Sequence, residues 1–555
     1  MSGRLEVIPL GGLGEFGMNC AALRAGDDLI LVDAGMMIPG RRPVTSLGVD
    51  LMVPDISFLL ENRSQLRGIV LTHGHEDHAG GVSYIIDQLQ VPVYANRLTL
   101  GLVSSRLRER GLDKEADLRS LEADRPVDLG VFRVEPLRVT HSFPESFCFA
   151  IRTPAGRIVW TGDFKFDQTP IDGHRSNLAR LAELGQEGVL ALFSDSTNAD
   201  VPGLSPSESS VYEPLENLFR QADGKIILAT FASSMHRIQI VLDLAREVGR
   251  KVVPLGRSMV SNIRLASRLG YLRTDSEVLG SRDDLARIPS ERLVVLASGT
   301  QGEPMSAMSR LAVDQVSQVR IEPGDLVLLS SRIIPGNEKA IGRMISNFYR
   351  RGARVLDSRH EPIHASGHGY REDLKLMIDL TRPRFFIPIH GEFRQLAAHA
   401  SLARRQGIPP DRVHLLESGE VLGLGPDKAE ILGRVRAGRR FIDEGIRRQV
   451  DRDLLRDRRF LATDGVLVVG LRLDRVSWEL IGEPELISRG FVQPEDSEDL
   501  MRETRARIRR LVSETGANGK RDEGLLEEML QTGLKRFLRK RTRKRPLIVP
   551  MMLAL

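Results

Sequence analysis

Short apolar runs separated by turn residues characterise the first 200 residues of the chain. The runs are rich in Val, Ile and Leu, and many are followed directly by Gly or Asp, which predicts strands that end in turns. The predicted strands are 5–9, 29–32, 68–72, 133–140, 157–161 and 189–194. Residues 82–90 and 98–110 have the apolar spacing of helices instead. This mixture predicts an α/β domain.

A stretch with a different pattern of predicted elements follows a loop rich in Ser and Pro at residues 201–210. In this stretch predicted strands alternate with predicted helices, which is typical of βαβ units around a parallel sheet. The strands are expected at 225–230, 252–254, 293–297 and 325–330, and the helices at 234–248 and 258–268. We therefore predict a separate domain at 205–360, around which the first domain is split.

The strand pattern of the first region returns after residue 360. Residues 439–462 are dense in Arg and Asp, which predicts an exposed helical linker. Beyond it, a strand at 465–470, two helical runs and a basic, strand-like tail predict a small α+β domain. The predicted organisation is a first domain at 1–204 and 361–438, an inserted domain at 205–360, a linker at 439–462 and a C-terminal domain at 463–555.

Length and composition agree with several ordinary globular domains. At roughly 150 residues per domain, 555 residues predict three or four domains. Hydrophobic residues make up 41% and charged residues 28%, which argues against global disorder. The two cysteines exclude a disulfide scaffold and a Cys-rich zinc module. Because the start lacks the apolar core of a signal peptide and no run approaches ~20 apolar residues, we expect a cytoplasmic protein with no membrane contact.

The formal net charge of +5 is slight for this length, but it is unevenly distributed. Residues 535–545 (KRFLRKRTRKR) carry +8, so the other residues sum to −3. Attraction to a nucleic acid would therefore come from local patches. The basic run itself allows two interpretations, a solvated face or a surface that contacts phosphates.

The strongest chemical signal is the segment HGHEDH at residues 73–78, directly after a predicted strand. Side chains two apart in an extended segment point the same way, so His73 and His75 can face one metal ion. After the turn, Asp77 and His78 can face a second ion. Imidazole nitrogens combined with a carboxylate suit zinc or a similar divalent ion.

Three more candidate ligands follow predicted strands elsewhere, namely His141, Asp163 and His390. Each alone would be interpreted as a turn or surface residue, but together they complete two ligand sets. One ion would take His73, His75 and His141, the other Asp77, His78 and His390, with Asp163 bridging them. Such a pair of ions lowers the pKa of a bound water to about 7. The predicted reaction class is metal-assisted hydrolysis.

These motifs resemble those of the metallo-β-lactamase superfamily. The long insert between Asp163 and His390, with FASSMHR at 231–237 and ASGTQGEP at 297–304, is similar to the β-CASP nucleases. Over nearly the whole chain, GGLGEFGMN at 11–19, GDFKFD at 162–167, SDSTNA at 194–199 and HASGH at 364–368 resemble bacterial ribonuclease J. One departure is Phe16 and Met18, because the family's first motif more often reads GEIGKN.

The resemblance implies a fold and an activity. The implied fold is a metallo-β-lactamase αββα sandwich interrupted by a β-CASP α/β domain, plus a small C-terminal domain. The implied activity is zinc-dependent hydrolysis of RNA, both 5′→3′ exonucleolytic with a preference for a 5′-monophosphate and endonucleolytic, in RNA maturation (including that of rRNA) and mRNA decay. The implied cofactors are two Zn²⁺ ions, with Mn²⁺ or Mg²⁺ as alternatives. The implied partners are the 5′ end of single-stranded RNA, further copies of the chain in a homodimer or homotetramer, and members of an RNA-degradation complex.

The resemblance also assigns roles to individual residues. It makes His368 the group that protonates the leaving oxygen or steadies the phosphate, and it makes Asp195 and Asp77 its catalytic companions. A packing histidine and a turn-capping aspartate are the alternatives for His368 and Asp195. The implied RNA contacts are Ala232, Ser233, Ser234, His364, Ala365, Ser366, Gly367 and His368. A simple helix N-cap is the alternative for residues 232–234.

Two further interpretations concern a structural ion and the substrate. Gly48, Asp50 and Asp443 are candidates for a calcium site, with surface turn acids as the alternative. The metal motif does not separate RNA from DNA, so a β-CASP nuclease acting on DNA stays open. A non-catalytic RNA-binding scaffold would be expected to lack ligands, and a small-molecule hydrolase such as a lactamase or thioesterase would lack the long insert.

Overall fold

The computed structural model describes residues 3–39, 49–303, 305–334, 336–443, 448–492, 497–517 and 523–555. The chain divides into two compact units. The first comprises residues 1–38 and 51–440, and the second comprises residues 39–50 and 441–555. Each unit has its own hydrophobic core.

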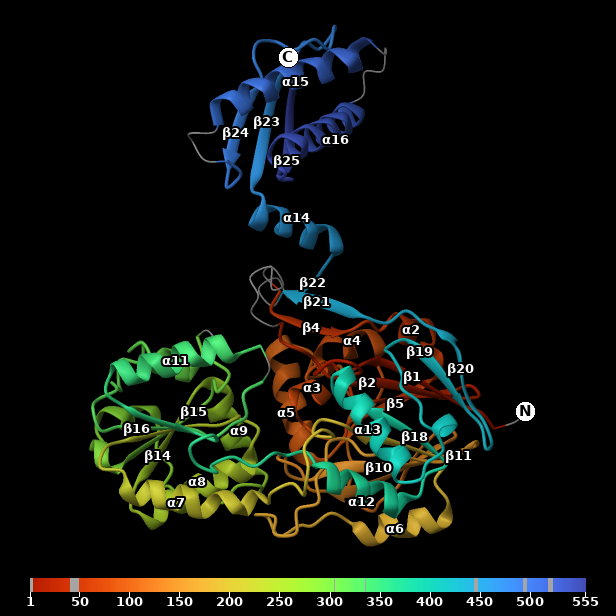
Figure 1. Ribbon diagram of the computed structural model, residues 1–555, viewed down its shortest axis with the longest axis vertical. Helices are drawn as coiled ribbons and strands as arrows, with labels where there is room; N and C mark the ends of the chain where they lie inside the picture. Colours follow the sequence, from red (N-terminus) through yellow and green to blue (C-terminus); the bar gives the residue numbers. More distant parts are fainter. Residues whose placement is uncertain are drawn as a thin grey trace. The chain divides into compact units, whose positions relative to one another are not determined.

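Two sheets packed face to face form the centre of the first unit (Figure 1). The first sheet has the order β20-β19-β1-β2-β3-β5-β6-β7, and the second β18-β12-β11-β10-β9-β8. The strands of the first sheet are β1 (Leu5–Gly11), β2 (Cys20–Ala25), β3 (Asp28–Val32), β5 (Leu66–Val70), β6 (Val93–Ala95), β7 (Leu118–Ser120), β19 (Glu420–Leu424) and β20 (Ala429–Arg434). Those of the second are β8 (Val127–Leu129), β9 (Phe132–Val139), β10 (Ser146–Thr153), β11 (Gly156–Trp160), β12 (Ala191–Asp195) and β18 (Phe385–Ile389).

Helices cover the outer face of each sheet, which makes four layers. The first sheet packs against α2 (Ser57–Glu61), α4 (Ile86–Leu89) and α5 (Arg97–Arg110). The second packs against α6 (Leu178–Glu187), α12 (Arg371–Thr381) and α13 (Phe393–Arg405). Strands such as β10 and β18 are buried on both faces, which explains their nearly continuous apolar sequence. This is the expected αββα sandwich.

The inserted stretch forms a sheet of its own, with the strand order β14-β15-β13-β16-β17 (Figure 1). All of its strand pairs are parallel. The strands are β13 (Ile226–Ala229), β14 (Lys251–Leu255), β15 (Leu293–Ala297), β16 (Leu326–Leu329) and β17 (Arg354–Asp357). One face is covered by α7 (Tyr212–Gln221), α8 (Met235–Glu247) and α9 (Arg257–Arg268), the other by α10 (Ala307–Leu311) and α11 (Glu338–Arg350). The expected βαβ architecture of this stretch is confirmed.

The second unit contains a three-stranded sheet and two long helices. The sheet has the order β24-β23-β25, formed by β24 (Glu485–Arg489), β23 (Val466–Leu473) and β25 (Leu547–Ala554). The helices α15 (Ser497–Ala517) and α16 (Glu523–Thr542) pack on one face of it. No helix within the described ranges is long and apolar enough to cross a membrane.

Two local expectations were wrong. The stretch expected to be a helical linker begins with strands β21 (Arg439–Asp443) and β22 (Arg448–Val450), and only α14 (Arg452–Thr463) is helical. The basic run expected to be strand-like lies mainly in the last turns of α16. Leu538 within the run and Leu534 directly before it lie four residues apart and are fully buried, so this part of the helix has an apolar stripe.

Candidate metal centre

The candidate ligands converge because they follow strands that end at the same edge of the sandwich. Strands β11, β12 and β18 are parallel neighbours, so Asp163, Asp195 and His390 emerge side by side. The segment 73–78 follows β5 and leads into the short helix α3 (Glu76–Ala79). His141 follows β9. Strand order thus brings together residues that lie more than 300 positions apart.

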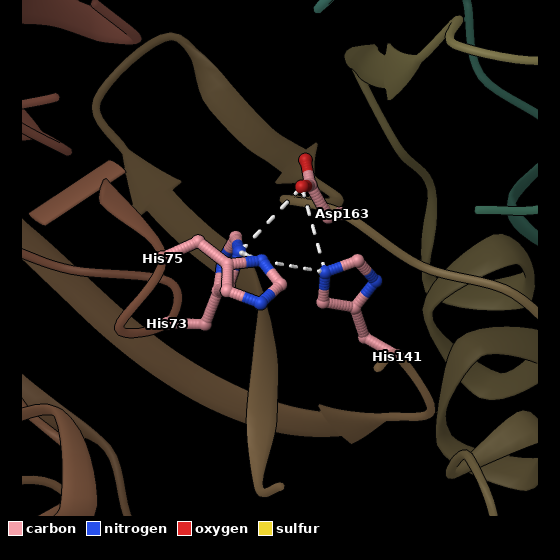
Figure 2. Close-up of side chains that lie close together, drawn as sticks. All are labelled: His73, His75, His141 and Asp163. Carbon is pink, nitrogen blue, oxygen red and sulfur yellow. Dashed lines mark hydrogen bonds and ion pairs between the residues drawn. The ribbon is translucent and has the colours of Figure 1, made fainter. Parts of the chain in front are cut away.

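The first ligand group consists of His73, His75, His141 and Asp163 (Figure 2). His75 Nδ1 lies 3.0 Å from His73 Nε2 and 3.1 Å from His141 Nε2. Asp163 Oδ2 lies 3.5 Å from His73 Nε2 and 3.7 Å from His141 Nε2. Burial lowers the pKa of all three imidazoles, that of His75 to about 4. Neutral nitrogens that face one another at such distances suit a shared cation.

The second ligand group consists of Asp77, His78, Asp163 and His390. His390 Nε2 lies 3.3 Å from Asp77 Oδ2 and 3.6 Å from Asp163 Oδ1. His78 Nε2 lies 3.2 Å from the same Asp163 oxygen. Asp163 therefore presents Oδ2 to the first group and Oδ1 to the second. This is the arrangement that a carboxylate bridging two ions needs.

Carboxylates dominate the electrostatics of the second group. Burial would lower the pKa of His390, but Asp163, Asp195 and Asp77 raise it to about 10. Burial would likewise lower the pKa of His78, and the charge of Asp163 raises it well above its usual value. Without a metal ion the two imidazoles take up protons that balance the carboxylates. The imidazole and carboxylate ligands of both groups therefore fit divalent ions, which would replace those protons.

Several residues that orient the ligands were missed in the sequence. Asp33 Oδ2 lies 2.8 Å from His78 Nδ1, and the Asp33 carboxylate also accepts hydrogen bonds from the backbone N–H and hydroxyl of Thr72. Thr197 Oγ1 lies 2.7 Å from His390 Nδ1. Such contacts fix which imidazole nitrogen faces the ion. Asp33 follows the end of β3, much as Asp163 follows the end of β11. Its position at a strand end could therefore have identified it in the sequence as a residue of the site.

His368 and Asp195 lie next to the ligand groups. His368 Nδ1 is 2.8 Å from Asp195 Oδ2, and its Nε2 is 3.9 Å from Asp163 Oδ2. Burial alone would lower the pKa of His368, but the charges of Asp195 and Asp163 raise it. Asp195 also accepts hydrogen bonds from the backbone N–H and hydroxyl of Thr197.

The residues of the segment HASGH (364–368) play two parts, because some of them pack around the metal centre and one reaches it. His364 is half-buried, its pKa lowered to about 3 by burial and neighbouring cations, and Ala365 packs in the core of the inserted domain. Ser366 Oγ accepts hydrogen bonds from Asn198 Nδ2 and from the backbone N–H of His368. Gly367 O lies 2.7 Å from His141 Nδ1. Of these five residues, His368 is the one whose side chain reaches the ligand groups.

The segment 232–234 precedes the N-terminus of α8 and is partly exposed. Ser234 is the N-cap residue, but its side chain makes no capping hydrogen bond. The Ala232 carbonyl accepts a hydrogen bond from Asn262 Nδ2, which fixes the turn. The alternative of a simple helix N-cap therefore does not explain the Ser234 hydroxyl.

The predicted calcium site is only partly visible. Gly48 lies outside the described residues. The backbone N–H of Asp50 donates to the carbonyl of Ile442, next to Asp443. The Asp443 carboxylate accepts a hydrogen bond from Arg458 at 3.0 Å. The calcium site stays a prediction.

The sandwich, its inserted parallel domain and the two ligand groups define a metal-dependent hydrolase of the metallo-β-lactamase superfamily. The superfamily model matches residues 13–203, and the model of the Zn-dependent metallo-hydrolase RNA specificity domain matches residues 356–414. The models of the ribonuclease J β-CASP and C-terminal domains match residues 223–348 and 453–555. The chain therefore belongs to the ribonuclease J family, and by that membership it is a metal-dependent ribonuclease.

Curated relatives align along the whole chain. Ribonuclease J of Thermus thermophilus is 40% identical over 99% of this chain and 95% of its own length. Ribonuclease J of Synechocystis is 38% identical over 99% and 86%, and ribonuclease J2 of Bacillus subtilis is 36% identical over 99% and 98%. A crystal structure of an Enterococcus faecalis protein of unknown function, 17% identical, covers 77% of this chain and 100% of its own with a TM-score of 0.52. That last likeness concerns the fold alone.

Proposed function

We propose that the chain hydrolyses phosphodiester bonds of single-stranded RNA at a centre of two Zn²⁺ ions, progressively from the 5′ end and also internally. The observation that carries this proposal is Asp163, whose two oxygens face the two ligand groups separately. Two divalent ions held there would supply a water of low pKa and stabilise charge on the phosphate. Mn²⁺ or Mg²⁺ would be alternatives in the same ligand sets.

His368 is the proposed general acid. The charges of Asp195 and Asp163 raise its pKa, which favours the protonated imidazole, and Asp195 fixes the ring through Nδ1. Nε2 is then the atom that donates to the leaving oxygen. Asp77 contributes as a ligand of the second group and as an acceptor near His390.

The start of α8 and the Ser366–His368 segment are the proposed RNA contacts. Backbone N–H groups at the start of a helix, together with the free Ser234 hydroxyl, suit a phosphate oxygen. A phosphate held there would explain a preference for a 5′-monophosphate. Equal degradation rates for RNAs with 5′-hydroxyl, 5′-monophosphate and 5′-triphosphate ends would contradict this pocket.

The central experiment follows RNA labelled at the 5′ or the 3′ end over time. With a 5′-monophosphate, the 5′ label should appear first as a mononucleotide, while internal fragments report endonuclease action. A chelator should stop both products, and added Zn²⁺ or Mn²⁺ should restore them. A matched DNA strand tests the alternative of a DNA nuclease. Equal cleavage of DNA and RNA would contradict RNA as the preferred substrate. A complete absence of hydrolysis by the metal-loaded protein would favour the RNA-binding scaffold.

A homodimer through the C-terminal domain is the proposed assembly. Alternate residues of β25 leave Val549, Met551 and Leu553 exposed, and Ile487 of β24 lies in the same cross-strand row as Val549. An apolar sheet face of this kind suits a second copy of the chain. Light scattering of the Met551→Glu, Leu553→Glu double variant tests it. A mass equal to that of the wild-type oligomer would contradict the proposal.

The cellular role proposed for this activity is RNA maturation, including that of rRNA, and mRNA decay in the cytoplasm. The chain would act there alone or with members of an RNA-degradation complex. Depleting the protein should lengthen mRNA half-lives and leave rRNA precursors with extended 5′ ends. Unchanged half-lives and 5′ ends would contradict this role.

A further inference from the structure

Helix α16 carries two different stripes along its length. Its buried stripe consists of Leu526, Leu530, Leu534 and Leu538, each at most 1% exposed. Its exposed stripe consists of Arg536, Arg539 and Lys540, continued by Arg543 directly after the last helical residue. The spacing of three, four and seven residues places these cations on one side of the helix. We call these four residues the α16 basic face.

The α16 basic face lacks neutralising partners. Among the residues that the structure describes, no carboxylate lies within ion-pair distance of Arg536, Arg539, Lys540 or Arg543. Several other arginines of the same unit are paired. Arg541 contacts Glu503 at 2.8 Å, Arg509 pairs with Glu483, and Arg472 lies 3.4 Å from Glu485. Among the described residues, no carboxylate therefore neutralises the charge of this face.

Helix stability accounts for only part of this face, namely Arg539 and Lys540 in the last turn of α16. Like charges three or four residues apart on a helix destabilise it by about 0.2–0.5 kcal/mol per pair. The helix dipole favours cations only within the last turn, and Arg536 lies six residues before Thr542, where the helix ends. Residues 535–545 carry +8 in a chain whose net charge is +5. A partner of opposite charge would relieve the repulsion.

We propose that the α16 basic face binds the sugar–phosphate backbone of the RNA substrate, independently of sequence, at nucleotides other than those held at the metal centre. This inference rests on the proposed function, in which RNA is the substrate, and adds to it a second RNA contact in the C-terminal unit. Over ~10 Å of helix, four unpaired cations present a row of charge. Arginine suits phosphate oxygens because its planar fork donates two hydrogen bonds.

Charge neutralisation tests the proposal. The full-length variant Arg536→Gln, Arg539→Gln, Lys540→Gln, Arg543→Gln keeps good helix formers and removes four charges. The matched control Arg472→Gln, Arg502→Gln, Arg509→Gln, Arg541→Gln removes four charges from arginines that are ion-paired in the same unit. Binding of a fluorescent 40-nucleotide RNA is measured with chelator present, across a series of NaCl concentrations.

We call the protein with these four changes in the α16 basic face the face variant. We expect it to bind the long RNA at least tenfold more weakly than the wild type at moderate salt. Its slope of log affinity against log salt should fall by up to about 3, because each lost contact to a single strand contributes about 0.7. The control variant should stay within about twofold of the wild type. An unchanged slope in the face variant, or equal losses in both variants, would overturn the proposal.

Hydrolysis assays with the metal-loaded protein test this inference separately from the proposed function. A 5′-phosphorylated trinucleotide offers few phosphates beyond those needed at the metal centre, so it should be hydrolysed equally by wild type and face variant. If the wild type fails on the trinucleotide and the long RNA alike, the proposed function is wrong. If it cleaves both and the face variant keeps wild-type affinity for long RNA, only the second contact is wrong.

A measurement on the wild type covers the case in which the face variant does not fold. Long RNA with photoreactive 4-thiouridine, crosslinked in chelator and digested, should label peptides from residues 535–545 as well as peptides near the metal centre. Labelling confined to the first unit would overturn the proposal.

Discussion

His368 Nδ1 lies 2.8 Å from Asp195 Oδ2, and the other oxygen of that carboxylate lies 3.4 Å from His390 Nδ1. One buried carboxylate thus orients both the proposed acid and a proposed metal ligand. Asp195 in turn accepts a hydrogen bond from Thr197. The proton donor and the second ligand group are therefore held by one rigid support.

The first prediction separates acid catalysis from metal binding. Replacing His368 with Ala should lower kcat by about 10²–10⁴, the usual contribution of a general acid, while the protein keeps two metal ions. Steady-state kinetics and metal analysis of the same sample measure the two effects. The matched control is His360→Ala, which removes a half-exposed histidine beside Asp357. Loss of metal together with activity in His368→Ala would contradict the acid role.

Removing the bridging carboxylate should have a larger effect. Asp163→Ala removes the oxygens that face both ligand groups, so we expect less than one bound ion per chain and no measurable hydrolysis. Asp223→Ala, a change of an exposed carboxylate in the same chain, should retain full activity and metal content. Full nuclease activity in Asp163→Ala would refute a dimetal mechanism.

Gly35 gives a steric test of the same centre. A Cβ added there would lie 1.7 Å from the carbonyl oxygen of Asp77. The Gly35→Ala variant must therefore displace the segment that carries Asp77 and His78, and we expect loss of the second metal ion and at least hundredfold lower activity. The control Gly342→Ala adds a Cβ with open space inside α11, which should stabilise the fold by about 0.5–1 kcal/mol. Wild-type metal content in Gly35→Ala would contradict this packing argument.

The sequence predicted those parts of the site that follow a strand. His141, Asp163 and His390 each come after an apolar run, and the end of a run can be recognised without knowing the fold. The neighbours that orient them could not be predicted this way. Thr197 contacts His390 across 193 positions, and a threonine in a turn carries no signal of that contact. Only strand order, which depends on packing across the whole domain, brings them together.

The wrong local expectations have a similar cause. In residues 535–545 the density of charge obscured the buried Leu538, which continues the apolar helical stripe of Leu534 before it. Residues 439–443 contain few apolar side chains, yet β21 forms because Phe441 and Asp443 pair with Val450 and Arg448. Backbone pairing with the next strand, β22, outweighed local composition there.

The junction between the sandwich and the inserted domain should depend on one buried ion pair. Arg237 of α8 contacts Glu208 at 2.8 Å and donates to the carbonyl of Ile363 at 2.8 Å. Glu208 and Ile363 belong to the two chain crossings between the domains. Arg237→Met leaves the Glu208 carboxylate buried and unpaired, so we expect a loss of about 3–5 kcal/mol in the free energy of unfolding.

Urea unfolding, followed by fluorescence and circular dichroism, measures this loss. The double variant Arg237→Met, Glu208→Leu should recover most of it, because both charges are then absent. The exposed pair Arg220–Glu216 supplies the control, and Arg220→Met should change the free energy by less than about 1 kcal/mol. A loss in Arg237→Met no greater than in this control would show that the buried pair does not hold the junction.

Asp167 gives the stability of the same junction a dependence on pH. Burial would raise the pKa of Asp167, but hydrogen bonds from Ser207 and the Glu208 N–H, with the nearby charge of Lys165, lower it below its usual value. A carboxyl group with a lowered folded-state pKa stabilises the fold above its unfolded pKa of about 3.9, and this contribution disappears as pH falls through the folded value.

Asp167→Asn should therefore be less stable than the wild type at pH 7, by about 1–3 kcal/mol, the usual worth of hydrogen bonds to a charged group. The difference should begin to shrink below about pH 4, where Asp167 of the unfolded wild type takes up its proton, and should go on shrinking until the folded carboxylate is protonated as well. Urea unfolding of both proteins between pH 7 and pH 3 measures it, with Asp223→Asn as an exposed control that should match the wild type throughout. A difference that stays constant across this range would mean that the charge of Asp167 does not stabilise the junction.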